Sequence, residues 1–422
     1  MNQPQPAEVN RVVEHFFRHK AGQLVATLTR IFGPGHLDLA ESMVQEALLK
    51  ACETWSYKGI PENPGGWITT VAKNQALDWI RREKRFQEKE AEIVRWYESH
   101  AAEENSAVGA IDDQLRLMFV CCHPSLSRKA QVALTLKTIG GFSAGEIARA
   151  FLSQEEATRK LLTRAKQTIR DEDVSFNLPP FHELAARLDT VLEILYLIFN
   201  EGYNAHEGER LIRRDFCDEA IRLTSLFLHV SLSNLPKLPT IKALLALLLL
   251  QSSRIPARLD AEGNLITLAE QDRSRWDQKR IALGLQYLRE AATGDELSVY
   301  HLQAHIAACH AMAPSYAKAD WPRLRDYYDQ LLQLAPNPVV ALNRAVATSM
   351  IDGCEAGLQE LQALAEEPIL QKYYLLPATV ADFYRQLQNP PKAREYYEKA
   401  LTLAGNDTEK RFLEKRIRDC RG

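Results

Sequence analysis

Apolar residues recur at helical spacing along nearly the whole of this 422-residue chain, and no alternating run is long enough to indicate a β-sheet. Proline and glycine gather at a few joints, at residues 33–35, 59–66, 178–180 and 336–338. Such clusters separate helices because they interrupt the hydrogen-bonded backbone. The sequence therefore predicts an all-α protein made of helices joined by turns.

Bulk composition limits the class of protein. Hydrophobic residues make up 46% of the chain and charged residues 25%, as in ordinary soluble globular proteins of two or three domains. The net charge of -3 gives by itself no sign of nucleic-acid binding. Seven cysteines form neither a CxxC pair nor a disulfide framework, which is typical of a reducing cytosol. Residues 1–10 are polar, unlike a signal peptide, and the apolar residues 244–250 are too few to span a bilayer. We expect a soluble cytoplasmic protein without a membrane partner.

One segment carries two capping boxes ten residues apart, Ser143 with Glu146 and Ser153 with Glu156. Each box marks a helix start, so the spacing predicts a short helix, a tight turn and a second helix, the outline of a helix-turn-helix. The second helix, residues 154–170, is strongly basic and has an apolar stripe. In this motif the start of the second helix faces base edges, and later cations lie near phosphates. A solvated basic helix in a bundle is the alternative.

Two earlier segments narrow the function. Residues 38–51 predict an amphipathic helix with an acidic and amide face. Residues 63–85 interleave aromatic and amide side chains and become basic towards their end. That mixture suits single-stranded DNA, because extruded bases need stacking surfaces and the backbone needs cations. Ordinary bundle helices with buried tryptophans are the alternative.

In their order and spacing, these segments resemble extracytoplasmic-function sigma factors of the sigma-70 family. Residues 38–51 and 63–85 look like region two, and residues 112–170 look like region four. The resemblance implies a non-enzymatic transcription initiation factor. Its implied partners are promoter DNA and core RNA polymerase, through the clamp of the largest subunit and the flap.

The resemblance also assigns side chains to three surfaces. The polymerase-binding residues are Asp38, Glu41, Gln45 and Glu46. The residues at the minus-ten element are Trp67, Lys73, Asn74, Trp79, Arg81, Arg82, Lys84 and Arg85, with the loop of residues 55–64 and Asn74 capturing a flipped base. The residues at the minus-thirty-five element are Glu155, Glu156, Thr158, Arg159, Lys160, Arg164 and Lys166.

Three positions depart from the family pattern. Ser42 stands where the docking helix usually has an acid, Leu152 stands at a turn position usually held by glycine, and Thr158 replaces a common buried valine. Ser42 would weaken polymerase docking slightly, and Leu152 would change the angle between the two helices. A packing change without functional meaning is the equal alternative for each.

The C-terminal half carries a repeat, because Tyr327 and Tyr328 recur 69 residues later at Tyr396 and Tyr397. That offset is close to two tetratricopeptide periods, and a coincidental helical hairpin repeat is the alternative. Segments 195–203, 270–277 and 341–347 extend the resemblance to a subgroup with a fused tetratricopeptide-like domain, which implies regulation through that domain and leaves room for a protein partner there. The expected domains are residues 8–87 (region two), 88–110 (linker), 111–173 (region four), 180–320 (helical extension) and 321–420 (tetratricopeptide-like repeats).

Polar residues in this half have two interpretations. A ligand or interdomain groove could be lined by Asn200, Glu201, Tyr203, Arg213, Arg214 and Asp215, although helix caps and ion pairs are the favoured reading. The charge run Glu270, Asp272, Arg273 and Arg275 indicates a solvated or interdomain face.

The remaining motifs predict no catalytic chemistry. Cys121, Cys122 and His123 lack the usual zinc spacing, so we expect buried cysteines at a helix end, and no metal or cofactor. Neither an HExxH motif nor a P-loop occurs. The competing functions are a stand-alone helix-turn-helix regulator with a tetratricopeptide sensor, and a peptide-binding scaffold with a degenerate N-terminal half.

Overall fold

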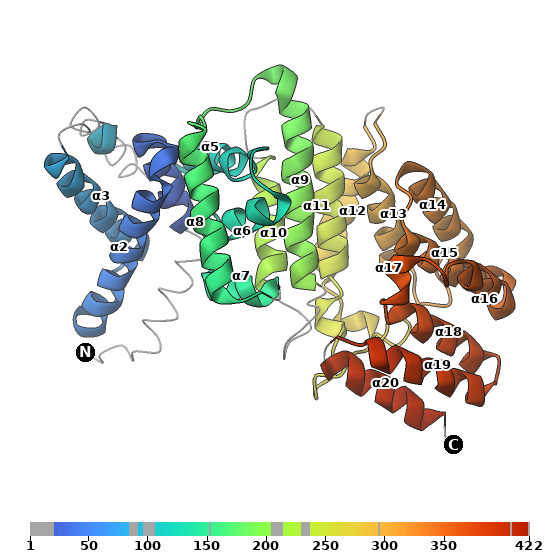
Figure 1. Cartoon of the computed structure of the whole chain (residues 1–422). Coiled ribbons are helices and arrows are strands. Elements are labelled where there is room, and N and C mark those ends of the chain that lie inside the picture. Colours follow the sequence, from blue (N-terminus) through green and yellow to red (C-terminus); the bar gives the residue numbers. More distant parts are fainter. Residues whose placement is uncertain are drawn as a thin grey trace. The chain divides into compact units, whose positions relative to one another are not determined.

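The computed structural model describes residues 21–83, 92–95, 106–151, 153–203, 214–228, 237–293, 296–405 and 407–420. Every regular element in these residues is an α-helix or a 3-10 helix, and their only β feature is an isolated antiparallel bridge between Leu259 and Leu265 (Figure 1). The all-α prediction is therefore confirmed. The chain forms two compact units: unit 1 is Met1–Ile198 with Ser225–Pro236, and unit 2 is Phe199–Thr224 with Lys237–Gly422.

The first helix that the structure describes in unit 1 covers residues 21–32, and residues 92–95 form a further helical turn. Its other elements are η1 (Pro34–His36), α2 (Leu37–Lys58), α3 (Pro64–Arg82), α5 (Ser106–Cys121), α6 (Arg128–Thr138), α7 (Ala144–Ala150), α8 (Glu155–Asp171) and the start of α9 (Phe181–Tyr203). The linker expected to end at residue 110 thus gives way to α5 already at Ser106. Both predicted DNA-binding segments belong to this one unit.

The start of α9 belongs to unit 1, although the sequence predicts a new domain from residue 180. Arg187 of α9 donates a 2.7 Å hydrogen bond to the carbonyl of Phe119 at the end of α5. Arg128 of α6 also forms a 2.8 Å ion pair with Glu193. These contacts attach the part of α9 up to Glu193 to α5 and α6, and the boundary between the units falls later, after Ile198.

Local signals explain where α2 and α3 begin and end. Gly59 ends α2 with a φ of 85°, a left-handed conformation that glycine adopts without strain. Asn63 caps α3 by accepting a hydrogen bond from the Gly66 amide, and Pro64 fits the first turn because it has no amide hydrogen to satisfy. The loop between the helices is therefore residues 59–63, shorter than the predicted 55–64.

Helices α7 and α8 follow each other closely in the segment where the sequence predicts a helix-turn-helix. The first capping box is present: Glu146 donates its backbone amide to the Ser143 hydroxyl, and its side chain accepts from the Ser143 amide. The second capping box was predicted wrongly. Gln154 is the N-cap of α8, and the Ser153 hydroxyl instead lies 2.9 Å from that of Thr158.

Unit 2 is a succession of helices. Its elements are most of α10 (Arg214–Leu226), then α11 (Leu238–Ser252), η3 (Ile255–Ala257), η4 (Arg273–Arg275), α12 (Gln278–Ala291), α13 (Val299–Met312), α14 (Trp321–Leu334), α15 (Pro338–Asp352), α16 (Cys354–Ala363), α17 (Pro368–Gln371), α18 (Leu375–Gln386), α19 (Pro390–Leu403) and α20 (Asp407–Asp419). Among the described residues, only the segment Leu238–Ala257 is long and apolar enough to cross a membrane, and about two thirds of it is buried within the fold. Burial of this kind is typical of a core helix, and α11 packs against α12 and α13.

The 69-residue repeat has a structural counterpart. Helices α14 and α19 begin and end 69 residues apart, and α15 and α20 begin 69 residues apart. Asp320 and Asn389 stand at equivalent positions and cap their helices through the same side-chain contact to the third helical residue. The repeat is therefore a repeat of helix pairs with equivalent starts.

The charge run at residues 270–275 has specific partners. Glu270 pairs with Arg416 at 2.6 Å, and Asp272 caps η4 through the Ser274 amide. Arg273 donates to the carbonyls of His310 and Ala313 and stacks on the Trp276 ring. The run therefore ties segments of unit 2 together, and only some of its charges face solvent.

Beside Arg273, a buried histidine is held neutral. His310 packs edge-on against Trp321 with 5.5 Å between ring centroids. Burial lowers the pKa of His310 to about 3, and the positive charges of Arg254 and Arg273 contribute to the shift. The unfolded chain takes up a proton near pH 6.5 whereas the folded chain does not, so the stability that this residue contributes at neutral pH is lost as the pH falls from 6.5 towards 3.

We predict that His310→Phe removes part of the acid sensitivity of the fold. As the pH falls from 7 to 5, the native chain should lose about 2 kcal/mol of unfolding free energy through His310. The variant should not lose this contribution, because phenylalanine has no titratable group. Calorimetry at several pH values checks this, with the exposed His182→Gln as the control. Equal pH dependence in His310→Phe and the native chain would contradict the prediction.

Candidate functional site

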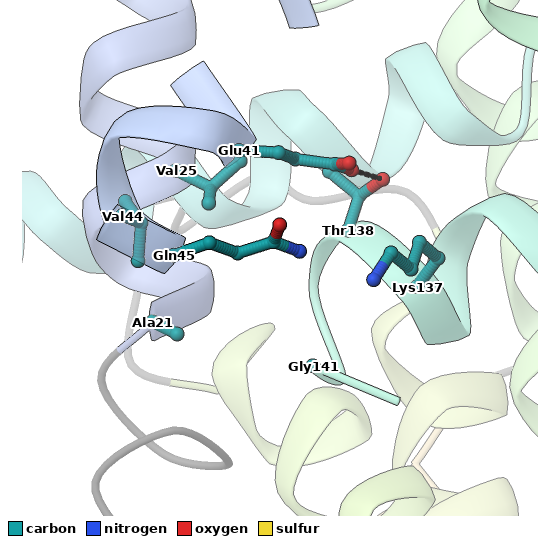
Figure 2. A pocket seen from close by; sticks show the side chains of 8 residues that line it. All are labelled: Ala21, Val25, Glu41, Val44, Gln45, Lys137, Thr138 and Gly141. Carbon is teal, nitrogen blue, oxygen red and sulfur yellow. Dashed lines mark hydrogen bonds between the residues drawn. The ribbon is translucent and has the colours of Figure 1, made fainter. Parts of the chain in front are cut away.

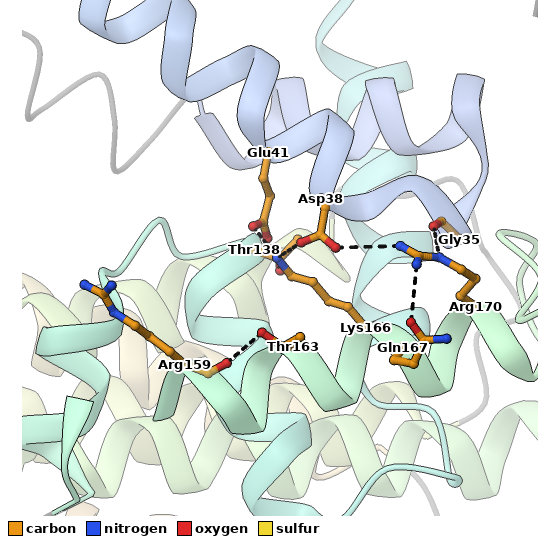
Figure 3. Close-up of polar contacts among 9 residues, drawn as sticks. All are labelled: Gly35, Asp38, Glu41, Thr138, Arg159, Thr163, Lys166, Gln167 and Arg170. Atoms are coloured by element: carbon orange, nitrogen blue, oxygen red, sulfur yellow. Dashed lines mark hydrogen bonds and ion pairs between the residues drawn. The ribbon is translucent and has the colours of Figure 1, made fainter. Parts of the chain in front are cut away.

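The predicted polymerase-binding face of α2 is in contact with the predicted DNA-reading helix α8 (Figure 3). The Lys166 ammonium lies 2.7 Å from a carboxylate oxygen of Asp38 and 2.7 Å from one of Glu41. Arg170, one turn further along α8, donates a 2.9 Å hydrogen bond to the Gly35 carbonyl and lies 3.7 Å from Asp38. The two predicted functional surfaces thus meet in one seam within unit 1.

Glu41 is at the centre of this seam and is only 8% exposed. One of its oxygens pairs with Lys166, and the other accepts a 2.7 Å hydrogen bond from the Thr138 hydroxyl at the end of α6. Both oxygens therefore have partners, as a buried carboxylate requires. The expected docking side chain is enclosed by its own chain.

The contacts of the seam differ in strength. The side chains of Lys166 and Glu41 are each 10% exposed, and removing one partner of such a buried pair typically costs about 3–5 kcal/mol. The side chains of Arg170 and Asp38 are 49% and 59% exposed, where an ion pair contributes about 0–1 kcal/mol. Burial by itself would lower the pKa of Lys166, but Glu41 and Asp38 outweigh burial and raise it, so the ammonium stays charged. The ion pair of Lys166 with Glu41 is therefore the contact that contributes most to the stability of the seam.

Next to Glu41 the seam contains a small hollow of about 20 Å³, close to the space that one water molecule needs. Gln45 of α2 and Lys137 of α6 extend into it from opposite sides (Figure 2). Three of the four predicted polymerase-binding residues, Asp38, Glu41 and Gln45, therefore border the seam. The fourth, Glu46, is exposed.

The predicted minus-ten residues lie along α3, but its aromatic rings mostly pack against the protein. Trp67 contacts the buried Trp55 edge-on at 5.4 Å, and Trp79 contacts Phe32 at 5.4 Å. Trp55 lies in α2 and is 1% exposed, so the prediction that it belongs to a base-capturing loop is wrong.

The polar residues of α3 are more accessible. Asn74, Arg81 and Arg82 are exposed and Lys73 is half-buried, whereas the predicted Lys84 and Arg85 lie outside the described residues. A strand held along α3 would thus meet polar and basic side chains more readily than stacking rings.

The start of α8 presents most of the predicted minus-thirty-five residues to solvent. Glu155 pairs with Arg159 and Glu156 pairs with Lys160, each one helical turn apart, and Arg164 is exposed. Thr158 is only 3% exposed and its hydroxyl contacts that of Ser153. Its position agrees with the alternative reading of a packing residue.

Beside these residues lies a basic groove of about 270 Å³. It is lined by Lys129, Ser153, Ala157, Thr158, Lys160, Leu161 and Arg164. Lys129 comes from α6, so the groove joins two helices of unit 1. The concentration of cations makes this surface suitable for phosphates.

Sequence reasoning missed the partners that close the seam. Thr138 and Gly35 carry no local signal, because they contact Glu41 and Arg170 across separations of 97 and 135 residues. Leu152, the departure at the turn, lies outside the described residues.

One overlooked sequence pattern has a structural explanation. Residues 141–145 have the form GxSxG, which in α/β-hydrolases presents a nucleophilic serine after a strand. Here the segment follows helix α6, and the Ser143 hydroxyl is engaged in the capping box with Glu146. The pattern therefore reflects helix capping.

The adjacent cysteines are placed as predicted. Cys121 and Cys122 are fully buried at the end of α5, and burial raises the pKa of Cys122 to about 12. Both thiols thus resemble small apolar core residues.

Comparison with known proteins gives three findings. Residues 16–86 match the family described as Sigma-70 region 2, and this range includes α2 and α3. Residues 187–292 match a family of unknown function, DUF6596. The chain is also 37% identical over 395 residues to an uncharacterized protein of Rhizobium meliloti (strain 1021), an alignment that covers 93% of this chain and 92% of that protein.

We predict that Trp55→Ala destabilises the chain by about 3–5 kcal/mol, because it leaves a cavity between α2 and α3. The control is Tyr57→Ala on the same helix: its side chain is 83% exposed, and the change should stay within about 0.5 kcal/mol. Chemical denaturation measures both variants. A Trp55→Ala protein as stable as the control would show that this ring is not a core residue.

Proposed function

We propose that the chain is a sigma factor of the sigma-70 family and of the extracytoplasmic-function type. Sigma factors of this family act in promoter recognition and transcription initiation together with core RNA polymerase. The observation that carries the proposal is the match of residues 16–86 to Sigma-70 region 2, where α2 and α3 present the acidic and the basic surfaces that this role needs.

In this proposal α2 binds the polymerase clamp through Asp38, Glu41, Gln45 and Glu46. Their common feature is an acidic and amide surface on one helix, which suits basic and polar groups on a partner. Glu46 and Gln45 are exposed already, whereas Glu41 is enclosed by Lys166 and Thr138. Docking through Glu41 therefore requires the seam to open.

The minus-ten element is proposed to bind along α3. Exposed Asn74 supplies an amide that can hydrogen-bond an extruded base, and Arg81 and Arg82 supply positive charge for the opened strand. Unstacking a base costs a few kcal/mol, and such contacts would recover this cost.

The minus-thirty-five element is proposed to bind at the start of α8. Glu155, Glu156 and Arg159 lie at the end of the helix that a helix-turn-helix directs to base edges. Lys160 and Arg164 line the basic groove, where phosphates would bind. The resemblance also implies a contact between the chain and the polymerase flap.

We predict that the double change Gln45→Ala and Glu46→Ala weakens binding to core RNA polymerase by about tenfold or more, the effect of losing charged hydrogen bonds at an interface. Gln45 and Glu46 are chosen in place of Glu41, because Glu41 also binds Lys166. Replacing Glu41 would therefore change the seam as well as the proposed polymerase contact. Titration of labelled protein with core polymerase measures the affinity.

Arg164→Ala is the matched comparison, because it should keep polymerase binding and weaken promoter binding by the holoenzyme. If polymerase binding is unaffected by the double change at Gln45 and Glu46, a stand-alone DNA-binding regulator becomes the better proposal.

The helices of unit 2 are proposed to form a tetratricopeptide-like regulatory domain that contacts a protein partner. This is supported by the repeated helix pairs of α14 with α15 and α19 with α20, each of which packs together. Stacked helix pairs of this kind build extended surfaces for protein partners.

We predict that deleting residues 321–420 changes transcription from the target promoters in cells, because the regulatory surface is lost. Transcript-start mapping in the deleted and the complete strain measures the change. Polymerase binding by the purified shortened chain is the control for folding of unit 1. Equal transcription with intact polymerase binding would remove the regulatory role.

A further inference from the structure

We propose that the free protein is held closed by an internal latch, in which α8 covers the part of the polymerase-docking face of α2 around Glu41. The latch consists of Lys166, Arg170 and Thr138 on one side and Asp38, Glu41 and Gly35 on the other. The inference rests on the proposed function, because it takes Asp38 and Glu41 to be polymerase-binding residues. Core RNA polymerase is then the ligand that must displace the latch.

The latch competes directly for the docking carboxylates. Both oxygens of Glu41 are occupied, one by Lys166 and the other by Thr138, and the residue is 8% exposed. A cation on polymerase cannot reach Glu41 until the Lys166 ammonium leaves. Asp38 is more exposed, yet it too lies within 2.7 Å of that ammonium.

The backbone also closes around these charges. A Cβ built on Gly22, in the helix over residues 21–32, would lie 2.2 Å from the carbonyl oxygen of Ile139 after α6. The two segments therefore approach as closely as only glycine permits. Together with the water-sized hollow at Gln45, this close approach shows that the seam is a packed interface and that the ion pairs are one part of it.

Lys166 also belongs to the proposed minus-thirty-five set, so one side chain serves two exclusive roles. In the latch its ammonium neutralises Glu41, and 10% of the side chain is exposed. When polymerase takes Glu41, Lys166 becomes available for a phosphate. Polymerase and promoter DNA should therefore favour the same open state, and each should strengthen the binding of the other.

A reversible cross-link tests the latch in the complete chain. A Cβ on Gly35 would lie 4.0 Å from the Cα of Arg170, a separation compatible with a disulfide between cysteines at these positions. The variant Gly35→Cys with Arg170→Cys should form this disulfide on mild oxidation. The oxidised protein should lose polymerase binding by about tenfold or more, and reduction should restore it.

The outcomes separate the latch from the proposed function. If the reduced double variant and the native chain both fail to bind core polymerase, the proposed function is wrong. If the native chain binds and the cross-linked protein binds equally well, the latch does not cover the docking face. Absence of the disulfide under oxidation would show that the closed state is not populated, which also overturns the latch.

Controls and a second variant sharpen the test. Each single-cysteine variant should bind polymerase equally when oxidised and reduced, which excludes effects of the native thiols.

Thr138→Val removes one hydrogen bond to Glu41 without touching a proposed polymerase or DNA contact. By favouring the open state, it should raise the apparent affinity for core polymerase about threefold to tenfold. Unchanged or weaker affinity would contradict the latch.

Discussion

The Lys166 ammonium lies between the carboxylates of Asp38 and Glu41, and the arrangement of unit 1 depends on this contact. A carboxylate as enclosed as Glu41 is tolerated only because a cation and a hydroxyl satisfy its two oxygens. In the proposed latch this requirement also allows the contact to open, since a partner that offers Glu41 another cation could replace Lys166 of α8. Surface pairs such as Arg170 with Asp38 orient the helices and contribute much less.

Helix α2 is suited to the proposed latch because its two faces have different chemistry. Trp55 is buried on the side that packs on α3, where it contacts Trp67. The acidic and amide residues occupy another face and reach either α8 or a partner. A rigid helix packed on one side can therefore exchange partners on the other without refolding, and α2 keeps its place in the proposed sigma region in either state.

Much of the helical framework could be predicted from local sequence. Ser143 with Glu146, and Asn63 before Pro64, mark helix starts because capping involves residues only a few positions apart. The repeat of helix pairs was also detectable, since equivalent side chains recur at a constant offset. Prediction was less accurate where local and tertiary preferences compete. Ser153 has the pattern of a capping box, but its hydroxyl contacts that of Thr158 instead. Trp55 was expected in a loop, but it lies in α2 and packs against Trp67.

The amino-acid sequence by itself determined the helical class, the order of the helices and the sets of charged side chains that we propose for polymerase and DNA binding, because periodicity, capping and charge are local properties. Only the tertiary structure decided that the acidic set on α2 and the basic set on α8 meet each other. That outcome depends on contacts between residues more than 90 positions apart, such as Thr138 with Glu41. Pairing of this kind is set by how the helices pack, and no spacing along the chain records it.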